Sequence, residues 1–533
     1  MRTFGSFGSF GSFGTFRSFG SFCRSNRLIA PTQNGPNVRT IRTVRTFTFC
    51  FLAFASFGAA EAPDLRLIEA VKRGDRTAVS SLLQKRVNPS ITEADGTTAL
   101  HWAVRQDDLE LAARLIRAGG DVNAANRYGV TPLYLACVNG NASMIERLLK
   151  AGADANAVAP EGESALMTAA RTGNVEAARV LLVHGALVDA TETWRGQTAL
   201  MWAAAQNHAS MVRELLAQGA NVNARSMVRR WERQSTAEPR EKWLPPGGMT
   251  PLLLAARQGA LESVRVLAAS GAELNAVDPD GISAVLSAII NGHFDVAGFL
   301  LDQGTDPNLA DKTGRAALYA AVDMNTLPDS NRPSPNVVEN ERTSLDLIKA
   351  LLARGANVNA QLKTQQPYRT KLDRGNDTVL TTGSTPLLRA AKAADIPAMR
   401  LLLDKGADAK LSTRNGVNPL MMAAGVGTRE EDTTGRRKAE SDAVEAVALC
   451  LAAGVDLNAA DTRGQTALHG AALQGLDSVV RYLAEHGATL DAKDKRGFTP
   501  LDAALGLAGG VGFDGRSSKP HESTAALLRQ LMN

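Results

Sequence analysis

Histidine and cysteine are the residues in this chain best suited to metal binding or to acid–base and nucleophilic catalysis. The 533-residue sequence contains seven His and four Cys, scattered from Cys23 to His521. Zinc sites place such residues in close pairs, such as Cys-x-x-Cys or His-x-x-x-His, and no such pair occurs here. We therefore predict neither a metal site nor a cofactor.

Two short segments resemble ligand-binding loops but lack the complete patterns. Gly506–Gly515 is glycine-rich, but it follows an expected helix and has no Gly-Lys-Ser/Thr ending, unlike a phosphate-binding loop. Asp278, Asp280 and Gly281 begin like a calcium loop, but the later ligands are missing. No serine occupies a Gly-x-Ser-x-Gly elbow. We predict no catalytic residues and no enzymatic activity.

The elements that must position any site are short repeats. A phrase such as Tyr128-Gly-Val-Thr-Pro-Leu-Tyr-Leu-Ala returns along the chain. Its glycines are Gly96, Gly129, Gly162, Gly196, Gly248, Gly281, Gly314, Gly383, Gly416, Gly464 and Gly497. Six of the successive intervals are 33 residues and one is 34. Such regularity indicates a repeat array rather than several separate domains.

The phrase resembles the ankyrin repeat, in which Thr-Pro-Leu-His-x-Ala opens the first of two helices every 33 residues. This resemblance implies an all-α ankyrin-repeat solenoid over residues 64–533. We expect about 12 helix-turn-helix units, joined by hairpin-like loops and interrupted by loop insertions. In this family the His of the phrase makes structural hydrogen bonds, which implies that role for His101 and His469.

The residue preferences inside each unit agree with this interpretation. Thr can cap the first helix, Pro suits its first position, and a Gly such as Gly140 ends it. Apolar residues then recur at helical spacing from Met144 onward. A single unit is too small to bury its apolar face, so neighbouring units must stack. Cys137 and Cys450 lie in distant repeats and are predicted to be small buried side chains.

The long intervals between phrases predict four insertions, at residues 226–247, 323–343, 361–381 and 425–442. The first is the most unusual, because it combines several cations with two Trp. Its cationic and aromatic residues include Arg229, Arg230, Trp231, Arg233 and Trp243. Exposed Trp side chains favour docking, either onto the solenoid or onto a partner. A simple solvated loop is the alternative.

The N-terminal segment has a different composition. Residues 1–37 are a low-complexity extension rich in Phe, Gly and Ser, either disordered or untranslated if translation begins near Val38. Residues 38–62 follow the signal-peptide pattern of a basic region, a short apolar run and small residues. The run is too short to span a membrane. We therefore expect no membrane span and a periplasmic or extracellular location.

The charge distribution argues against nucleic acid as a partner. Residues 1–60 carry seven Arg and no Asp, Glu or Lys, whereas the remainder has 52 basic and 54 acidic residues. The basic composition therefore belongs to the N-terminal segment. The repeat body lacks the net positive charge that general binding to nucleic acid requires.

A binding surface remains the favoured functional site. In the ankyrin family, hairpin tips and the exposed sides of the first helices line a groove, and Trp, Tyr and Arg anchor many interfaces. Trp194 is the foremost candidate for partner contact, followed by Tyr128 and by Arg229, Arg230, Trp231, Arg233 and Trp243 of the first insertion. Trp102 and Trp202 are expected to be partly buried between repeats.

We therefore predict a monomeric scaffold that binds a partner protein. Two alternatives remain at this stage. The protein could be a structural or stress-protective component of the cell envelope without one specific partner. It could also be a secreted effector directed at a host, although an export signal makes this alternative weaker.

Overall fold

The computed structural model describes residues 64–159, 161–229, 246–326, 340–364, 379–427, 439–508 and 520–533. The chain divides into two units, Met1–Glu61 and Ala62–Asn533, and all described residues belong to the second. The extension predicted at 1–37 and the signal peptide predicted at 38–62 lie outside the described residues.

The described residues form 24 helices and no strands, arranged as 12 pairs, as the repeat pattern predicts. The first helices are α1 (Arg66–Lys72), α3 (Ala99–Arg105), α5 (Pro132–Asn139), α7 (Ala165–Thr172), α9 (Ala199–Ala205), α11 (Pro251–Gln258), α13 (Ala284–Ile290), α15 (Ala317–Thr326), α17 (Pro386–Ala393), α19 (Pro419–Ala423), α21 (Ala467–Gln474) and α23 (Pro500–Ala504). The second helices are α2 (Arg76–Gln84), α4 (Leu109–Arg117), α6 (Ala142–Lys150), α8 (Val175–Val183), α10 (Ala209–Ala217), α12 (Leu261–Ala269), α14 (Phe294–Asp302), α16 (Ser344–Ala353), α18 (Ile396–Asp404), α20 (Glu440–Ala452), α22 (Asp477–Glu485) and α24 (Glu522–Met532).

The third pair shows why each phrase folds as a helix. Thr131 precedes α5 with an extended backbone, and its hydroxyl accepts a hydrogen bond from the Tyr134 N–H at 3.2 Å. Pro132 occupies the first turn, where no intrahelical N–H is needed. The helix ends at Gly140, whose φ of 72° is left-handed and favours glycine. Asn141 then caps α6 through the Met144 N–H.

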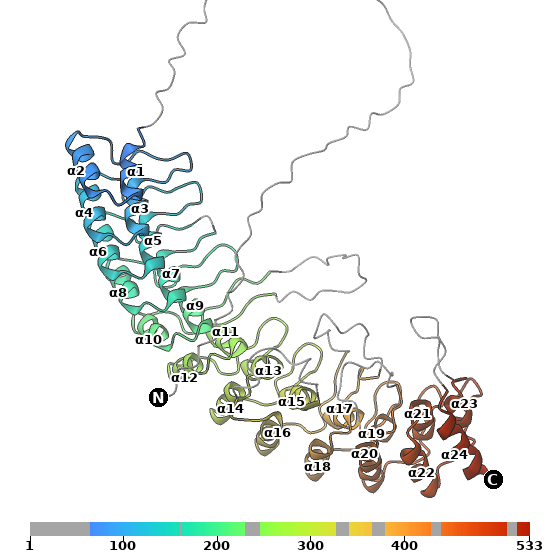
Figure 1. Cartoon of the computed structure of the whole chain (residues 1–533). Coiled ribbons are helices and arrows are strands. Elements are labelled where there is room, and N and C mark those ends of the chain that lie inside the picture. The colour runs from blue at the N-terminus through green and yellow to red at the C-terminus, as the bar shows by residue number, and fades with distance from the viewer. Residues whose placement is uncertain are drawn as a thin grey trace, which may run out of the picture. The chain divides into compact units, whose positions relative to one another are not determined.

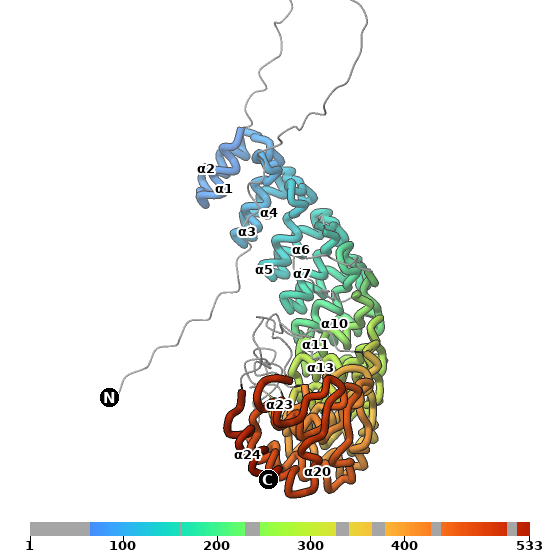
Figure 2. The backbone as a smooth tube through the Cα atoms, turned by 90° about the vertical axis from the view of Figure 1, so that its right-hand side faces the viewer, coloured from blue at the N-terminus to red at the C-terminus, as the bar shows by residue number. Residues whose placement is uncertain are grey.

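The core is a continuous layer of Ala and Leu side chains between the helices. Each first helix packs against its own second helix and against the first helices of the neighbouring pairs. Small residues such as Ala103, Ala136 and Ala169 are fully buried, which lets adjacent first helices approach closely. Figures 1 and 2 show the pairs stacked in chain order, from α1 and α2 to α23 and α24.

The structure changes the edges of two predicted insertions. Helix α15 continues to Thr326, because Met324 and Thr326 are buried and extend its packed face. Helix α20 begins at Glu440. Residues 323–326 and 440–442 are therefore helical. The central parts of the four insertions, residues 230–245, 327–339, 365–378 and 428–438, lie outside the described residues.

Candidate partner-binding surface

Neighbouring hairpins are joined by backbone hydrogen bonds, which fix how their tips lie against one another. The Thr193 N–H donates to the Glu161 carbonyl at 3.0 Å, and the Met227 N–H donates to the Arg195 carbonyl at 2.7 Å. The tip that carries Trp194 is thus held between the tips before and after it. The sequence predicted a hairpin at each position, and the structure shows that most of the described hairpins are bonded to the hairpin before them.

The Trp194 tip is braced from within by Glu192. This carboxylate is only 5% exposed and accepts hydrogen bonds from the N–H groups of Trp194, Arg195 and Gln197. The bonds to Arg195 and Gln197 measure 2.8 and 3.0 Å. Because three N–H groups converge on one buried carboxylate, the backbone under Trp194 is fixed. The indole nevertheless remains 56% exposed.

Arg229 connects the first insertion to this tip. Its backbone N–H donates to the Pro246 carbonyl at 2.7 Å, and its guanidinium donates to the Thr193 carbonyl at 3.2 Å. The guanidinium carbon lies 4.9 Å from the centroid of the Trp194 ring, within the range of a cation–π contact. The structure therefore brings Trp194 and Arg229 together. Arg230, Trp231, Arg233 and Trp243 lie outside the described residues.

Exposed apolar side chains continue along the adjacent hairpins. Tyr128 is 57% exposed, and its hydroxyl accepts a 2.6 Å hydrogen bond from Arg127, whose guanidinium also lies 4.8 Å from the ring centroid. Val158, Met227 and Val228 are exposed as well. Several exposed apolar residues on consecutive loops are typical of an interaction surface. Sequence reasoning found Tyr128 and Trp194 but missed the three aliphatic residues.

Trp102 and Trp202 are partly buried at the first helices, as predicted. The Trp102 indole N–H donates to the Glu93 carboxylate at 2.8 Å, and the Lys72 ammonium lies 4.9 Å from the ring centroid. The buried indole nitrogen of Trp202 finds no hydrogen-bond partner among the described residues, while Arg171 lies 5.9 Å from its ring centroid. Both rings pack between units and expose only part of their surface to solvent.

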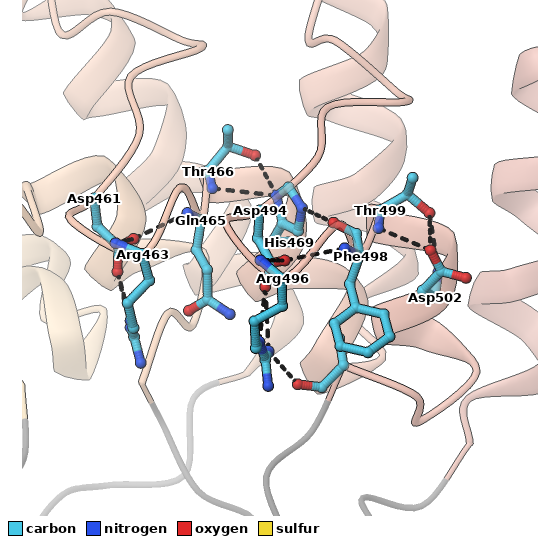
Figure 3. Close-up of polar contacts among 11 residues, drawn as sticks. Asp461, Arg463, Gln465, Thr466, His469, Asp494, Arg496, Phe498, Thr499 and Asp502 are labelled. Carbon is cyan, nitrogen blue, oxygen red and sulfur yellow. Dashed lines mark hydrogen bonds and ion pairs between the residues drawn. The ribbon is translucent and has the colours of Figure 1, made fainter.

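The histidines of the repeat phrase join neighbouring units, as the resemblance implies. In Figure 3, His469 bridges Thr466 and Phe498. Its Nδ1 lies 3.0 Å from the Thr466 hydroxyl, and its Nε2 lies 3.1 Å from the Phe498 carbonyl in the next unit. Burial lowers the pKa of His469 below its usual value. His101 makes the equivalent contacts, and burial lowers its pKa as well. Neutral, doubly bonded rings suit a structural role.

Three further histidines have a role that sequence reasoning missed. His208, His293 and His521 stand immediately before α10, α14 and α24. Each ring lies against the glycine that ends a first helix of the preceding unit, and the His208 Nε2 lies 3.0 Å from the Arg171 carbonyl. Asn174 occupies the equivalent position beside Gly140, and its side-chain amide donates to the Gly140 carbonyl at 2.6 Å. The shared position before a second helix was the available signal.

The remaining groups that drew attention in the sequence are also structural. Cys137 is fully buried, and burial raises the pKa of its thiol to about 12, so the reactive thiolate is suppressed. Cys450 is buried too. Asp278 accepts the N–H groups of Asp280 and Ile282 at 2.9 Å each, which makes it a hairpin brace. Within the described part of the chain, no group of three or more His, Cys, Asp or Glu residues could hold a metal ion.

Stacked helix pairs, bonded hairpins and an exposed aromatic surface together define a repeat scaffold of the protein-binding class. The model of the family described as "Ankyrin repeats (3 copies)" matches residues 67–159, 139–226, 252–362 and 437–509, which together exceed half of the chain. The chain therefore belongs to the ankyrin repeat family. Ankyrin repeats are general protein–protein interaction modules, and the fold is typically non-enzymatic.

Several known proteins share this similarity. Over 255 residues, the chain is 29% identical to human "Ankyrin repeat and SOCS box protein 16", covering 48% of this chain and 47% of that protein. Over 194 residues, it is 33% identical to the mouse "B-cell lymphoma 3 protein homolog", covering 33% of this chain and 39% of that protein. The matches thus span less than half the length of each relative.

The crystal structure of the human ASB11 ankyrin repeat domain is also similar. It is 28% identical, with a TM-score of 0.38, and the match covers 45% of this chain and 98% of that domain. Among the helices of the described ranges, none is long and apolar enough to cross a membrane.

Proposed function

We propose that this protein is a scaffold that binds a partner protein through the hairpin tips around Trp194. The supporting observation is the exposed indole itself, carried on a tip that a buried carboxylate braces and stacked against Arg229. A rigid, exposed aromatic side chain loses little conformational entropy when a partner covers it. Trp and Arg are also the residue types that most often dominate interface energies.

The exposed aliphatic residues beside this pair extend the proposed interface. Val158, Met227 and Val228 lie on the flanking hairpins, so a partner would cover apolar area on both sides of the indole. Burial of such area contributes roughly 25 cal/mol per Å² before the costs of association. The insertion residues Arg230, Trp231, Arg233 and Trp243 are proposed to contribute further contacts.

We further propose that the protein acts as a monomer after export by the signal peptide at residues 38–62. The basic, apolar and small-residue regions of that segment support this proposal. Fractionation of cells that express the full chain, with a tag at its C-terminus, tests it. Processed protein in the periplasm or medium supports export, and unprocessed protein in the cytoplasm contradicts it. Light scattering of the purified protein tests the monomer.

The scaffold proposal is tested by crosslinking capture from envelope extract with the full chain as bait. The test variant carries Trp194→Ala, Trp231→Ala and Trp243→Ala. The control variant carries Val183→Ala and Leu187→Ala, which removes exposed apolar groups away from the proposed site. A discrete protein captured by the wild type and the control, but not by the test variant, supports the proposal.

Two other outcomes would redirect the interpretation. Failure of all three baits to capture a discrete protein would favour a structural or stress-protective envelope component. Equal capture by all three would retain a binding scaffold but place the interface away from Trp194. Repeating the capture with a host-cell extract would test the effector alternative by the same comparison.

A further inference from the structure

The hairpins of the C-terminal half carry a row of cations at equivalent positions. Lys312, Lys363, Arg414 and Lys495 each donate their backbone N–H to a carbonyl of the preceding hairpin, and each bond measures 2.8 Å. The shared bond defines the equivalence, because it places each residue at the same point of its tip. In the remaining described hairpin of this stretch, Thr462 occupies that position at 2.9 Å. We call these four cations the basic tip row.

The side chains of the basic tip row are exposed. Lys312 pairs with Asp280 at 2.8 Å across neighbouring tips. For Lys363, Arg414 and Lys495, the described residues provide no ion pair. Exposed charges of this kind keep their hydration in the free protein and can exchange it for an anionic partner at low cost.

The acidic residues of the same tips are turned inward and are already bonded. Figure 3 shows Asp461 and Asp494, each of which accepts N–H groups of its own hairpin. Asp494 accepts from Arg496 at 2.8 Å and from Phe498 at 3.0 Å. Burial raises the pKa of Asp494, but these hydrogen bonds and the Arg496 guanidinium outweigh burial, so its pKa lies below the usual value.

The braced carboxylates also direct two more cations outward. The Arg463 and Arg496 guanidinium groups extend from Asp461 and Asp494 in Figure 3, and their side chains are 57% and 49% exposed. Arg463 directly follows Thr462, so a cation is present at the tip where the row is interrupted. Each acid thus satisfies backbone N–H groups and also pairs with its own arginine, at 2.9 Å for Arg463 and 3.2 Å for Arg496, while the two guanidinium groups remain about half exposed.

Exposed acids, among them Asp491, do occur in the turns that precede these hairpins, and two of them are engaged locally. Asp408 accepts the Lys410 N–H at 2.9 Å, and Asp456 accepts the Asn458 N–H at 3.0 Å. They neutralise part of the charge of the C-terminal half. They do not occupy the tip positions that the backbone bonds define.

The N-terminal hairpins differ at the same positions. The equivalent N–H groups belong to Arg127, Thr193 and Met227, which are mixed in character. The aromatic surface around Trp194 and the basic tip row are therefore two surfaces with different chemistry, on successive parts of the row of hairpins.

We infer that the basic tip row binds an extended acidic segment of a protein partner. This inference rests on the proposed scaffold function and adds the chemistry of a second contact. Packed repeats are about 10 Å apart, and a polypeptide in the polyproline II conformation advances about 3.1 Å per residue with three residues per turn, so that every third side chain lies on the same face. A carboxylate at every third residue would therefore meet one cation per tip. Charge complementarity of this kind mainly sets specificity and association rate.

A nucleic acid is the less favoured anion for this surface. The repeat body carries slightly more acidic than basic residues, whereas binding to nucleic acid depends on a net basic face. A peptide that follows one row of tips avoids most of the acidic surface elsewhere. The experiment below includes an oligonucleotide so that this alternative becomes a measured outcome.

The test measures binding of short fluorescent peptides to the purified full chain by anisotropy. One peptide repeats Glu-Gly-Ser, a second has the same composition with its glutamates in one block, and a third replaces Glu with Gln. We expect the first to bind more tightly than the second and the third not to bind. Added salt should weaken the binding.

Two charge-matched variants locate the site. The tip variant carries Lys312→Gln, Lys363→Gln, Arg414→Gln and Lys495→Gln. The control variant carries Lys85→Gln, Arg147→Gln, Lys405→Gln and Arg481→Gln, which removes four exposed cations from other surfaces. We expect the tip variant to bind the Glu-Gly-Ser peptide about tenfold more weakly and the control within about twofold of the wild type. Circular dichroism and the thermal unfolding midpoint establish that both variants fold.

Three results would overturn the inference. These are equal losses in both variants, equal binding of the spaced and block peptides, or tighter binding of a single-stranded oligonucleotide that depends on the same cations. If the Glu-Gly-Ser peptide does not bind but partner capture through Trp194 persists, the basic tip row is not a binding site and the proposed scaffold function is retained. If the peptide binds but no partner is captured, the basic tip row is retained as a binding site and the proposed scaffold function through Trp194 is not.

Discussion

The Arg229 guanidinium carbon lies 4.9 Å from the centroid of the Trp194 ring, and the two residues come from successive hairpins. The contact joins the braced tip to the first residues of the insertion, because the Arg229 backbone is itself bonded to Pro246. An aromatic ring that would otherwise be mobile is thereby oriented while much of it remains exposed.

Trp194→Ala is expected to change the free energy of unfolding by less than about 0.5 kcal/mol, because the ring is largely outside the core. Trp102→Ala should cost about 2 kcal/mol, because its ring packs against the core and its N–H bonds Glu93. Urea unfolding followed by circular dichroism measures both. Equal costs would show that Trp194 has a packing role.

Stability should fall as the pH drops from neutral to about 5. Burial lowers the pKa of His101, His293 and His469 in the folded state, so the unfolded chain binds more protons below about 6.5. The contribution of these rings is complete above pH 6.5 and is lost as the pH falls toward their folded pKa values. The thermal unfolding midpoint, measured across this range, checks the slope.

A variant with His101→Gln, His293→Gln and His469→Gln should show a flatter pH profile between 7 and 5, even if its midpoint is lower throughout. Carboxylates such as Asp95 and Asp346, whose pKa values are lowered by backbone and side-chain hydrogen bonds, lose their contribution only at more acidic pH. An unchanged slope in the His variant would assign the pH dependence to other groups.

Gly259→Ala should destabilise the protein more than Gly271→Ala does. Both glycines have left-handed backbones, with φ of 73° and 85°. A Cβ at Gly259 would lie 2.4 Å from the His293 Nδ1, whereas a Cβ at Gly271 meets nothing within 4 Å. Each substitution carries a backbone cost of about 1–2 kcal/mol. The additional loss at Gly259, seen as a lower unfolding midpoint, measures the close contact between units.

Breaking the ion pair between Arg389 and Asp323 should lower the free energy of unfolding more than most single substitutions of buried residues. The Arg389 Nε lies 2.6 Å from the Asp323 carboxylate, and both side chains are at most 5% exposed. Asp323→Asn leaves a buried guanidinium with a weakened counter-charge, so we expect a cost of about 3 kcal/mol. Urea unfolding of Asp323→Asn, Arg389→Met and the double variant checks this.

The double variant supplies the diagnostic comparison. In the double variant neither member of this pair leaves the other buried without its counter-charge, so its cost should be smaller than the sum of the two single costs. Strict additivity would mean that the two side chains do not act as a pair.

The sequence alone determined the helices, their caps and the number of pairs. These features depend on contacts within about one repeat, such as Thr131 with Tyr134 or Gly140 at the end of α5. Because the 33-residue period repeats the same local hydrogen bonds, the structure predicted for one repeat phrase applies to nearly every unit. The structural roles of His101 and His469 followed from the resemblance of the phrase to the ankyrin repeat.

Only the tertiary structure decided which residues meet between units. The sequence named Trp194 and Arg229 separately, but their stacking depends on the start of an insertion that has no period. The Arg389–Asp323 pair, the histidines beside Gly173 and Gly259, and the basic tip row were likewise not visible in the repeat phrase. Contacts between units depend on the register of neighbouring hairpins and helices. That register is set by packing and backbone hydrogen bonds across the stack, and not by the local preferences of any single segment.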